Sequence, residues 1–417
     1  MLWQSRFVRM GQIGRVVLIR NAVETLGYFS EQIASELRCL GYETYFIDYE
    51  DLYVCVQGAE RFVQRGDAAL VTFNFIGLSG EEIFMGEDGR SLWDRYNVRV
   101  YCLLADHPMY YHRQLLGAFE NLKVFCVDRG HVSYMHRFYP GVQVGFLPLG
   151  GNACGRDWES ATESARERAV ESVPYSMRRY DVVFTANYVP PGMFEGKLTE
   201  LGAEYEAFYR GILDDLLSDP GQTMDAVMER HLKEELGTVP EEELAEALYG
   251  MRWLDLYART LLRGGLVREL VDEDVPVRVF GAGWEELECK KRQNLIRESG
   301  QVDSAACVEA MRQARIALNV LPWFRDGAHD RIFTAMQQGA LALTDAAPYL
   351  REEFSDGKEL VFFSLQRKEE LPRLVRTLQE DQEWAALIAA CGHKKAFRHT
   401  WAERARALAR ELEKDQI

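Results

Sequence analysis

The sequence predicts an α/β protein with two doubly wound domains, each a parallel sheet covered by helices. At 417 residues the chain is too long for one ordinary hydrophobic core, so two domains are expected. Short apolar segments rich in β-branched residues alternate with segments of helical periodicity, and parallel strands need a helix to connect them. A polar stretch without a strand pattern, residues 151–178, predicts the connection between the domains.

The first domain is expected over residues 1–178, with the connection included. Strands are predicted at 14–20, 43–49, 68–75, 98–106, 122–128 and 142–150. Helices are predicted at 28–41, about 51–65, 110–119 and 129–138.

The second domain is expected over residues 179–393. Its strands are predicted at 180–188, 275–283, 315–321, 340–345 and 359–363. A helical block at 196–268 interrupts the series, and further helices are predicted near 304–314, 329–338, 367–379 and 383–391. One long helix, about 394–414, is expected to close the chain, in a terminal segment that covers residues 394–417.

Composition excludes several classes of function. The net charge of -16 argues against binding of nucleic acid or anionic membranes, which needs a basic surface. No apolar run approaches the roughly 18 residues of a membrane helix, so no integral membrane segment is expected. The eight cysteines stand apart, without a CxxC pair or a Cys/His cluster, which favours reduced thiols in a cytoplasmic protein.

The stretch FRDGAHDRIFTAMQQGALALTD, residues 324–345, places charges where a strand ends and a helix begins. The strand is expected to end at Leu321 and the helix to start near Asp330. Unpaired N–H groups and the dipole at a helix amino end favour an anion there. Arg325 and Arg331 add guanidinium groups suited to phosphate, and His329 adds a donor, so we infer a diphosphate site.

A structural interpretation of the same charges remains open. Asp330 can serve as the N-cap of the helix. Arg325 and Arg331 can pair with Asp326 and Glu352 on the surface.

Two further segments are compatible with a ligand site in the second domain. In VFGAGWEE, Gly281 and Gly283 follow a strand and would let the main chain approach a ligand closely. In SGQVDSAACVEAMRQA, Gly300 and Gln301 precede an N-cap expected at 303–304. Taken singly, the first segment also fits an ordinary turn and the second a plain loop before a helix.

Together and in this order, the segments resemble the carboxyl-terminal domain of GT-B glycosyltransferases. The closest resemblance is to the bacterial family known as CgeB-like or glycosyl transferases group 1. It covers about 180–390 and rests on Gly281 to Trp284, Gly300, Leu318–Asn319, His329–Arg331, Gly339–Ala340 and Thr344–Asp345. The first domain matches in architecture and in short details such as DHP (106–108) and LPLGGN (147–152).

The resemblance implies two Rossmann-like domains facing a cleft, with a closing helix that returns to the first domain. It implies a nucleotide-sugar donor bound by the second domain, an acceptor bound by the first, and no metal ion or other cofactor. The implied donor-binding residues are Gly281, Gly283, Trp284, Gln301, Arg325, Asp326, His329, Asp330, Arg331, Thr334 and Asp345. Many retaining relatives have two glutamates at the positions of Asp326 and Thr334; a threonine can still bond a ribose hydroxyl, though more weakly than a carboxylate.

An inverting enzyme also needs a base on the acceptor side. His107 with Asp106, at the end of a predicted strand, is the first candidate, and a histidine held in the turn before Pro108 is the alternative. Glu24, after the first strand, is a second candidate base, and Asn74 is expected to contact the acceptor or the sugar.

Three functions remain open at the level of sequence. The first is transfer of a sugar, from a UDP-sugar or a similar donor, to a glycan or a protein. The second is a noncatalytic nucleotide-binding or spore and cell-surface assembly protein, which the threonine at 334 keeps open. The third is an NAD-dependent dehydrogenase, disfavoured because no GxGxxG follows the first strand. The acidic run DED, 272–274, is read as a solvated turn and not as a metal site.

Overall fold

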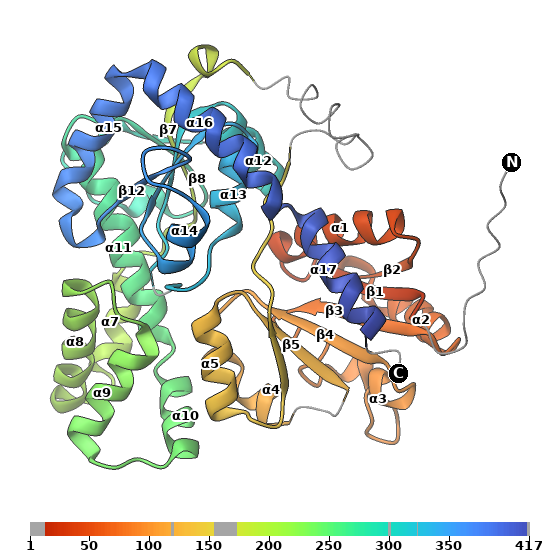
Figure 1. Ribbon diagram of the computed structural model, residues 1–417. Coiled ribbons are helices and arrows are strands. Elements are labelled where there is room, and N and C mark those ends of the chain that lie inside the picture. Colours follow the sequence, from red (N-terminus) through yellow and green to blue (C-terminus); the bar gives the residue numbers. More distant parts are fainter. Residues whose placement is uncertain (1–12, 118–120, 154–172, 299–301, 323, 415–417) are drawn as a thin grey trace, which may run out of the picture. The chain divides into compact units, whose positions relative to one another are not determined.

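The computed structural model describes residues 13–117, 121–153, 173–298, 302–322 and 324–414. The chain forms two compact units, unit 1 (Met1–Leu149 and Trp401–Ile417) and unit 2 (Gly150–Thr400). Each unit contains a six-stranded sheet whose strand pairs are all parallel (Figure 1). The two doubly wound α/β units confirm the fold class that the sequence predicts.

Unit 1 has the strand order β2-β1-β3-β4-β5-β6. Its strands are β1 (Arg15–Arg20), β2 (Glu43–Asp48), β3 (Ala68–Phe73), β4 (Arg99–Leu104), β5 (Leu122–Cys126) and β6 (Gln143–Phe146). Its helices are α1 (Glu24–Cys39), α2 (Leu52–Val63), α3 (Leu92–Arg95), α4 (His112–Leu116), α5 (Arg129–Phe138) and α17 (Trp401–Lys414). The order reverses between β1 and β3, and ligands of open α/β sheets bind beside the carboxyl ends at such a switch point.

Unit 2 has the order β12-β11-β10-β7-β8-β9, which switches between β7 and β10. Its strands are β7 (Tyr180–Thr185), β8 (Val277–Phe280), β9 (Leu295–Arg297), β10 (Ala314–Asn319), β11 (Leu341–Asp345) and β12 (Val361–Phe363). Read from β9, this is the order of dinucleotide-binding Rossmann sheets.

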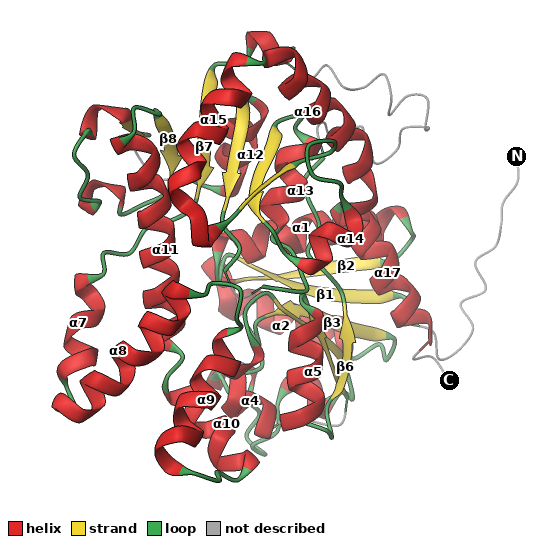
Figure 2. Ribbon diagram, turned by 60° about the vertical axis from the view of Figure 1, so that its left-hand side comes forward, coloured by secondary structure: helices red, strands yellow, loops and turns green. Residues whose placement is uncertain are grey.

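Unit 2 carries the predicted helical insertion between β7 and β8. The insertion consists of α7 (Gly192–Thr199), α8 (Ala203–Ser218), α9 (Met224–Leu236), α10 (Glu241–Gly250) and α11 (Trp253–Asp272). The other helices are α12 (Ser304–Arg312), α13 (Asp330–Gln337), α14 (Pro348–Glu353), α15 (Leu371–Glu380) and α16 (Gln382–Ala396) (Figure 2). The sequence analysis missed the short elements α3, β9 and α14.

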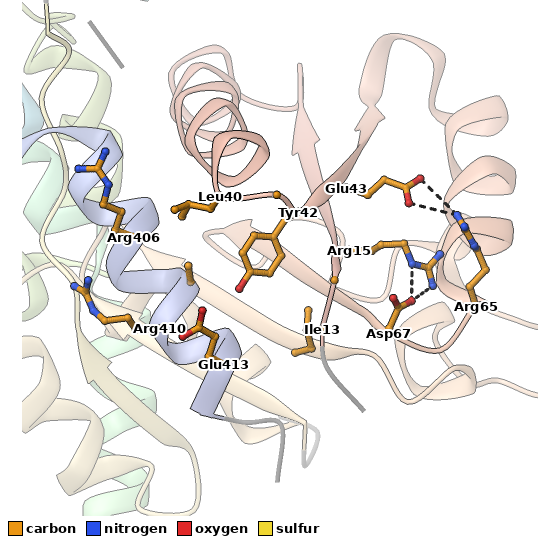
Figure 3. Close-up of a pocket in the computed structure, with 13 residues that line it drawn as sticks. Ile13, Arg15, Leu40, Tyr42, Glu43, Arg65, Asp67, Arg406, Arg410 and Glu413 are labelled. Atoms are coloured by element: carbon orange, nitrogen blue, oxygen red, sulfur yellow. Dashed lines mark hydrogen bonds and ion pairs between the residues drawn. The ribbon is translucent and has the colours of Figure 1, made fainter. Parts of the chain in front are cut away.

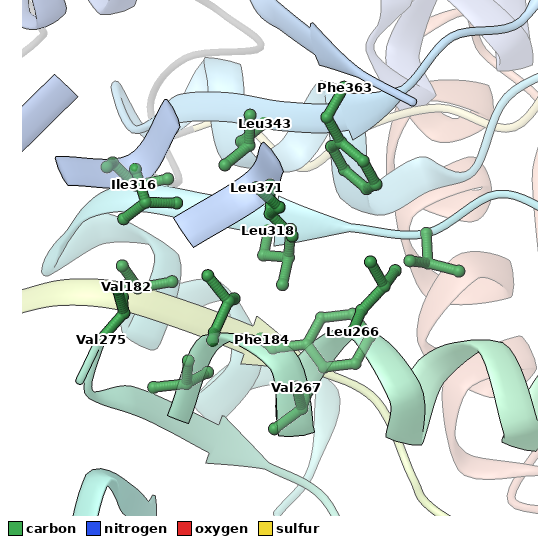
Figure 4. Packing of buried hydrophobic residues seen from close by; sticks show 14 of the residues in the cluster. Val182, Phe184, Leu266, Val267, Val275, Ile316, Leu318, Leu343, Phe363 and Leu371 are labelled. Atoms are coloured by element: carbon green, nitrogen blue, oxygen red, sulfur yellow. The ribbon is translucent and has the colours of Figure 1, made fainter. Parts of the chain in front are cut away.

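The central strands of unit 2 are buried on both faces, because alternate side chains point to opposite sides of the sheet. On one face Phe184 and Leu318 pack with Leu266 of α11 and Leu371 of α15 (Figure 4). On the other, Val183 and neighbours of β10 and β11 lie against α12 and α13. Burial on both faces explains why the sequences of these strands are almost continuously apolar.

The unit boundaries differ from the expected limits at 178 and 393. The Gly151 N–H donates to the His399 carbonyl at 2.6 Å, and the Asn152 N–H donates to the Thr334 hydroxyl at 3.1 Å. Arg178 is buried and donates to the carbonyls of Ala314 and Gln338. Both described ends of the expected connection are therefore held within unit 2.

The closing helix was predicted as one element, 394–414, and this was wrong. Residues up to Ala396 complete α16, a 3-10 turn covers Phe397–His399, and α17 begins at Trp401. Thr400 is extended and forms a β-bridge with Gly151, which ends the helical hydrogen bonding. Helix α17 belongs to unit 1, where Trp401 packs on Phe29 with ring centroids 4.5 Å apart.

Among the described residues, no helix combines the length and the apolar character needed to cross a bilayer.

Candidate functional site

The amino end of α13 lies at the switch point of unit 2. Strand β10 ends at Asn319, and the chain returns through residues 320–329 to start α13 at Asp330. Arg331, in the first turn, donates from Nη1 to the carbonyl of Thr185, the last residue of β7, at 2.5 Å. The guanidinium therefore reaches the end of β7, the strand on the other side of the switch point.

His329 and Arg331 form one partly buried cluster. The Arg331 Nη2 lies 2.8 Å from His329 Nδ1, and the imidazole packs edge-on against Phe324 with ring centroids 5.0 Å apart. A guanidinium has five N–H donors, and the contacts of Arg331 with the Thr185 carbonyl and with His329 engage two of them. The side chains of His329 and Arg331 are thus held against the protein and not directed freely into solvent.

Other cations act on this cluster from a distant segment. Burial, followed by the charges of Arg331, Arg263 and Arg259, holds the pKa of His329 well below its ordinary value. Burial also lowers the pKa of Arg331, and the charge of Arg259 lowers it further. An imidazole kept neutral among guanidinium groups indicates a site of excess positive potential.

Asp330 is the first residue of α13 and not its N-cap, so the capping interpretation of the sequence is wrong. His329 occupies the N-cap position, without a side-chain hydrogen bond to the helix. Burial raises the pKa of Asp330 to about 6, against the lowering effect of Arg331. A carboxyl group that protonates this readily opposes an incoming anion less than a fully ionised one does.

The glycines after β8 are required by the fold itself. A Cβ on Gly281 would lie 2.3 Å from the Ala186 carbonyl oxygen, and one on Gly283 would lie 1.9 Å from the Tyr188 carbonyl oxygen. Both glycines also have positive φ angles, 144° and 86°. They allow the chain after β8 to pass close to the chain after β7. From the sequence they had been expected to let a ligand approach the main chain.

Trp284 was expected to contact the donor, and the structure corrects this. Its side chain is 1% exposed, stacks on Tyr188 at 5.1 Å, and donates its indole N–H to the Ala186 carbonyl at 2.6 Å. The tryptophan therefore anchors the loop after β8 in the core. Packing of this loop onto the core, and not contact with a nucleotide, therefore accounts for the tryptophan at position 284.

Thr334, the expected ribose contact, is 2% exposed, and its hydroxyl oxygen accepts from the main-chain and side-chain N–H groups of Asn152. The expectation is corrected, because this hydroxyl fixes the segment 150–152 within unit 2. Gln301, another expected donor contact, and Gly300 lie outside the described residues.

Arg325 and Asp345 line a pocket to which neither His329 nor Arg331 contributes. It is a cavity of about 360 Å³ at the carboxyl ends of β11 and β12. Arg325 donates to the Ala346 carbonyl at 3.0 Å and lies 3.8 Å from Asp345 Oδ2. Asp326, beside Arg325 in the same loop, is partly buried. The sequence grouped these residues with Arg331, and the structure assigns Arg325 and Asp345 to a different pocket.

Unit 1 brings Asn74 and Asp106 together at the carboxyl ends of β3 and β4. The Asn74 amide N–H donates to Asp106 Oδ2 at 2.9 Å, and its Oδ1 accepts from the Ala105 N–H at 2.9 Å. The Tyr111 hydroxyl also donates to Asp106 Oδ2, at 3.3 Å. Among the contacts of the described residues, Asp106 Oδ1 accepts no hydrogen bond, so one oxygen of an oriented carboxylate is available.

Backbone strain supports the same turn. Asn74 and Phe75 both have left-handed φ angles, 52° and 58°, which non-glycine residues adopt at a cost. The Phe75 N–H contacts the Cys102 sulfur at 3.3 Å. Asparagine tolerates this conformation better than most residues, and here its amide also joins the ends of two strands.

His107 occupies the structural position that the sequence left as an alternative. It is 9% exposed, its Nδ1 accepts from the Met109 N–H at 3.1 Å, and its ring packs edge-on against His131 and Tyr134. It caps the 3-10 turn Pro108–Tyr111. The geometry therefore favours Asp106 over His107 as the reactive group of this pair.

Glu24 is the exposed first residue of α1 and accepts from the Thr25 hydroxyl at 3.2 Å. It follows β1 and so lies at the carboxyl edge of the unit 1 sheet, near its switch point. It remains a candidate beside Asp106.

A cavity of about 820 Å³ in unit 1 lies at the opposite edge of the sheet (Figure 3). It is bounded by the residues that begin β1 and β2 and by Arg406 and Glu413 of α17. Three of its arginines are paired, Arg15 with Asp67, Arg65 with Glu43 and Arg406 with Glu36. Size alone does not make it the candidate site, because catalytic groups of such sheets collect at the carboxyl edge.

Sequence reasoning missed Arg259 and Arg263, which shape the electrostatics around His329. They stand four residues apart on α11 and thus share one helix face. This spacing was readable from the sequence. Its relation to α13 was not, because about seventy residues and three strands separate Arg259 from His329.

Comparisons with known proteins agree with this architecture. Residues 259–410 match the family model described as glycosyl transferase-like. No curated protein matches the chain. Among solved structures, T4 phage BGT in complex with its UDP-glucose substrate has a TM-score of 0.52 at 12% identity, covering 96% of this chain and 99% of that one.

A second structure, Anabaena HepE in complex with UDP-glucose, has a TM-score of 0.50 at 11% identity, again over 96% and 99% of the two chains. At such identities the likeness concerns the fold. The chain thus has the GT-B glycosyltransferase fold, and the part of it from residue 259 to 410 matches the glycosyl transferase-like family.

Proposed function

We propose that the protein is a glycosyltransferase that moves a hexose from a UDP-sugar to a hydroxyl group of a glycan or protein acceptor, without a metal ion. The observation that supports it best is the Arg331 cluster at the switch point of unit 2. Transfer from a nucleotide sugar requires stabilisation of a departing diphosphate, and N–H groups at a helix end with a guanidinium meet that need.

The donor is proposed to bind unit 2 at the amino end of α13, through the guanidinium of Arg331. The neutral His329 supplies hydrogen-bonding capacity without adding a formal charge. The two similar structures bind UDP-glucose, which favours UDP as the nucleotide.

The acceptor is proposed to bind unit 1 beside Asp106. In the reaction the acceptor oxygen forms a bond to the anomeric carbon, the bond from that carbon to the diphosphate breaks, and the acceptor proton passes to Asp106. Asn74 and Tyr111 orient the carboxylate through Oδ2 and leave Oδ1 to take the proton.

The test is calorimetric titration of UDP into the wild type and the Arg331→Ala variant. Loss of a charge-assisted contact is expected to weaken binding about 100-fold, or roughly 3 kcal/mol. Arg373→Ala, which removes an exposed arginine of α15, serves as the matched control and should bind like the wild type. Equal affinity of the Arg331→Ala variant and the wild type would refute the diphosphate position.

A thermal-shift screen separates the proposed function from the two alternatives. UDP and UDP-sugars are expected to raise the melting temperature, because they bind the folded state. A response to NAD alone would indicate a dehydrogenase. No response to UDP, GDP, ADP or NAD would favour the noncatalytic assembly protein.

A further inference from the structure

The cavity at the carboxyl ends of β11 and β12, here the β11–β12 pocket, contains a second set of ionisable groups. Its walls include Arg325, Arg351, Arg367, Asp345 and Asp356. The turn Pro220–Gly221, which follows α8, closes one side. No residue of the Arg331 cluster lines it, so the two sites of unit 2 are formed by different side chains.

The arginines of this pocket are only partly compensated. Arg351 is exposed and its guanidinium lies over the Phe362 ring, 4.8 Å from the centroid. Within the described part of the chain it forms no ion pair. Arg325 donates to a carbonyl and lies 3.8 Å from its nearest carboxylate oxygen, whereas Arg367 is paired with Glu370 at 3.1 Å. The guanidinium groups of Arg325 and Arg351 can therefore donate hydrogen bonds to an anionic ligand.

Asp345 gives a separate indication that a ligand binds in this pocket. It is 2% exposed, and its Oδ1 accepts from the Leu321 N–H at 2.6 Å. Its Oδ2 is buried without a hydrogen-bond partner, although it belongs to a residue that lines the cavity. A buried oxygen in this state is costly, and a donor brought by a ligand would remove the cost.

We propose that the β11–β12 pocket binds a small sugar anion, a hexose that carries a phosphate or a carboxylate. The anionic group contacts Arg351 and Arg325, and a sugar hydroxyl donates to Asp345 Oδ2. The volume of about 360 Å³ is near the lower end of small-molecule sites, which suits a monosaccharide. The proposal does not depend on sugar transfer, because it concerns binding by residues outside the proposed donor site.

Calorimetry on the full chain tests the proposal with three probes, glucose 6-phosphate, glucuronate and glucose. At least one of the two anions is expected to bind at least 10-fold more tightly than glucose. Preference for glucose 6-phosphate identifies the anionic group as a phosphate ester, and preference for glucuronate identifies it as a carboxylate. Equal affinity for glucose and both anions, or binding of none, would overturn the proposal.

Two variants locate the binding. Arg351→Ala removes an exposed side chain and is expected to lower the affinity for the preferred anion at least 10-fold. Arg373→Ala should leave this affinity unchanged. Asp345→Asn keeps the acceptor for Leu321, replaces Oδ2 by an amide donor, and should weaken binding about 10-fold. Unchanged affinity in Arg351→Ala would contradict the assignment.

Competition with UDP distinguishes this pocket from the donor site. Saturating UDP is expected to leave the affinity for the sugar anion within 2-fold, since the two ligands use different residues. Displacement of the sugar anion by UDP, with the same concentration dependence as UDP binding, would show that the pocket is not a separate site. Anion binding in a protein that fails to bind UDP would refute the proposed function but not this inference.

Discussion

The carboxyl edges of the two sheets differ in the charge that they present. In unit 2 the edge at the switch point carries Arg331 and a neutral His329, under the influence of two more arginines. In unit 1 the corresponding edge carries Asp106, held by Asn74 and Tyr111. Two six-stranded parallel sheets, with different strand orders, therefore support an anion site in one unit and a hydrogen-bonded carboxylate in the other.

The turns that build the two edges also differ. Unit 2 uses glycines at 281 and 283, because any side chain there would strike a carbonyl of the segment 186–188. Unit 1 accepts two left-handed non-glycine residues, Asn74 and Phe75, and the Asn74 amide compensates by joining β3 to β4. Close packing determines the first turn, and placement of a polar side chain determines the second.

The largest expected effect concerns the carboxylate of unit 1. Asp106→Asn keeps the shape but cannot take a proton, so UDP release from UDP-glucose with water as acceptor should slow about 100-fold. UDP affinity should not change, because the nucleotide is assigned to unit 2. Glu24→Gln is the matched control, and a greater loss of rate in this variant would transfer the role of base to Glu24.

The contrast between the turns predicts a stability effect. Gly283→Ala places a Cβ against the Tyr188 carbonyl at a positive φ and should lower the free energy of unfolding by about 3 kcal/mol. Gly196→Ala, in α7 with no atom near the added Cβ, should not destabilise the protein. Urea denaturation measures both, and equal stability of the two variants would remove the packing explanation.

The buried carboxyl group of Asp345, at the carboxyl edge of the unit 2 sheet, should make the stability of the protein depend on pH. Burial raises the pKa of Asp345 to about 6 from an ordinary value of 3.8. The stabilising contribution is complete below pH 3.8, where the group is protonated in both states, and is lost as the pH rises through 6. Relative to Asp345→Asn, the wild type should lose about 2 kcal/mol of unfolding free energy between pH 4 and pH 7. Parallel stability profiles for the two proteins would contradict a buried, protonation-linked Asp345.

The smallest expected effect tests the neutral histidine. A bound diphosphate offsets the positive charges that depress the pKa of His329, so binding should favour its protonated form. Affinity for UDP-glucose, measured calorimetrically, should rise several-fold, up to about 10-fold, from pH 8 to pH 5.5. His329→Gln should flatten this profile. Affinity that falls toward acid pH in the wild type would place the diphosphate away from His329.

The sequence by itself determined the class of fold and most of its elements. Apolar segments such as 15–20 and 341–345 have the composition of strands buried on both faces, and α13 begins at Asp330, where the helix was expected to start. The charged residues before a helix also made Arg331 and His329 candidates for a site without any structure. These features are local, because periodicity and helix ends are set by residues a few positions apart.

Only the tertiary structure decided which of these residues share a site. It placed Trp284 in the core, gave the Thr334 hydroxyl to Asn152, and separated Arg325 and Asp345 from Arg331. It also gave His107 a capping role and brought the charges of Arg259 and Arg263 to bear on His329. The physical reason is that these partners lie far apart in the chain, and the order of strands in a sheet, which no local pattern encodes, determines which strand ends meet.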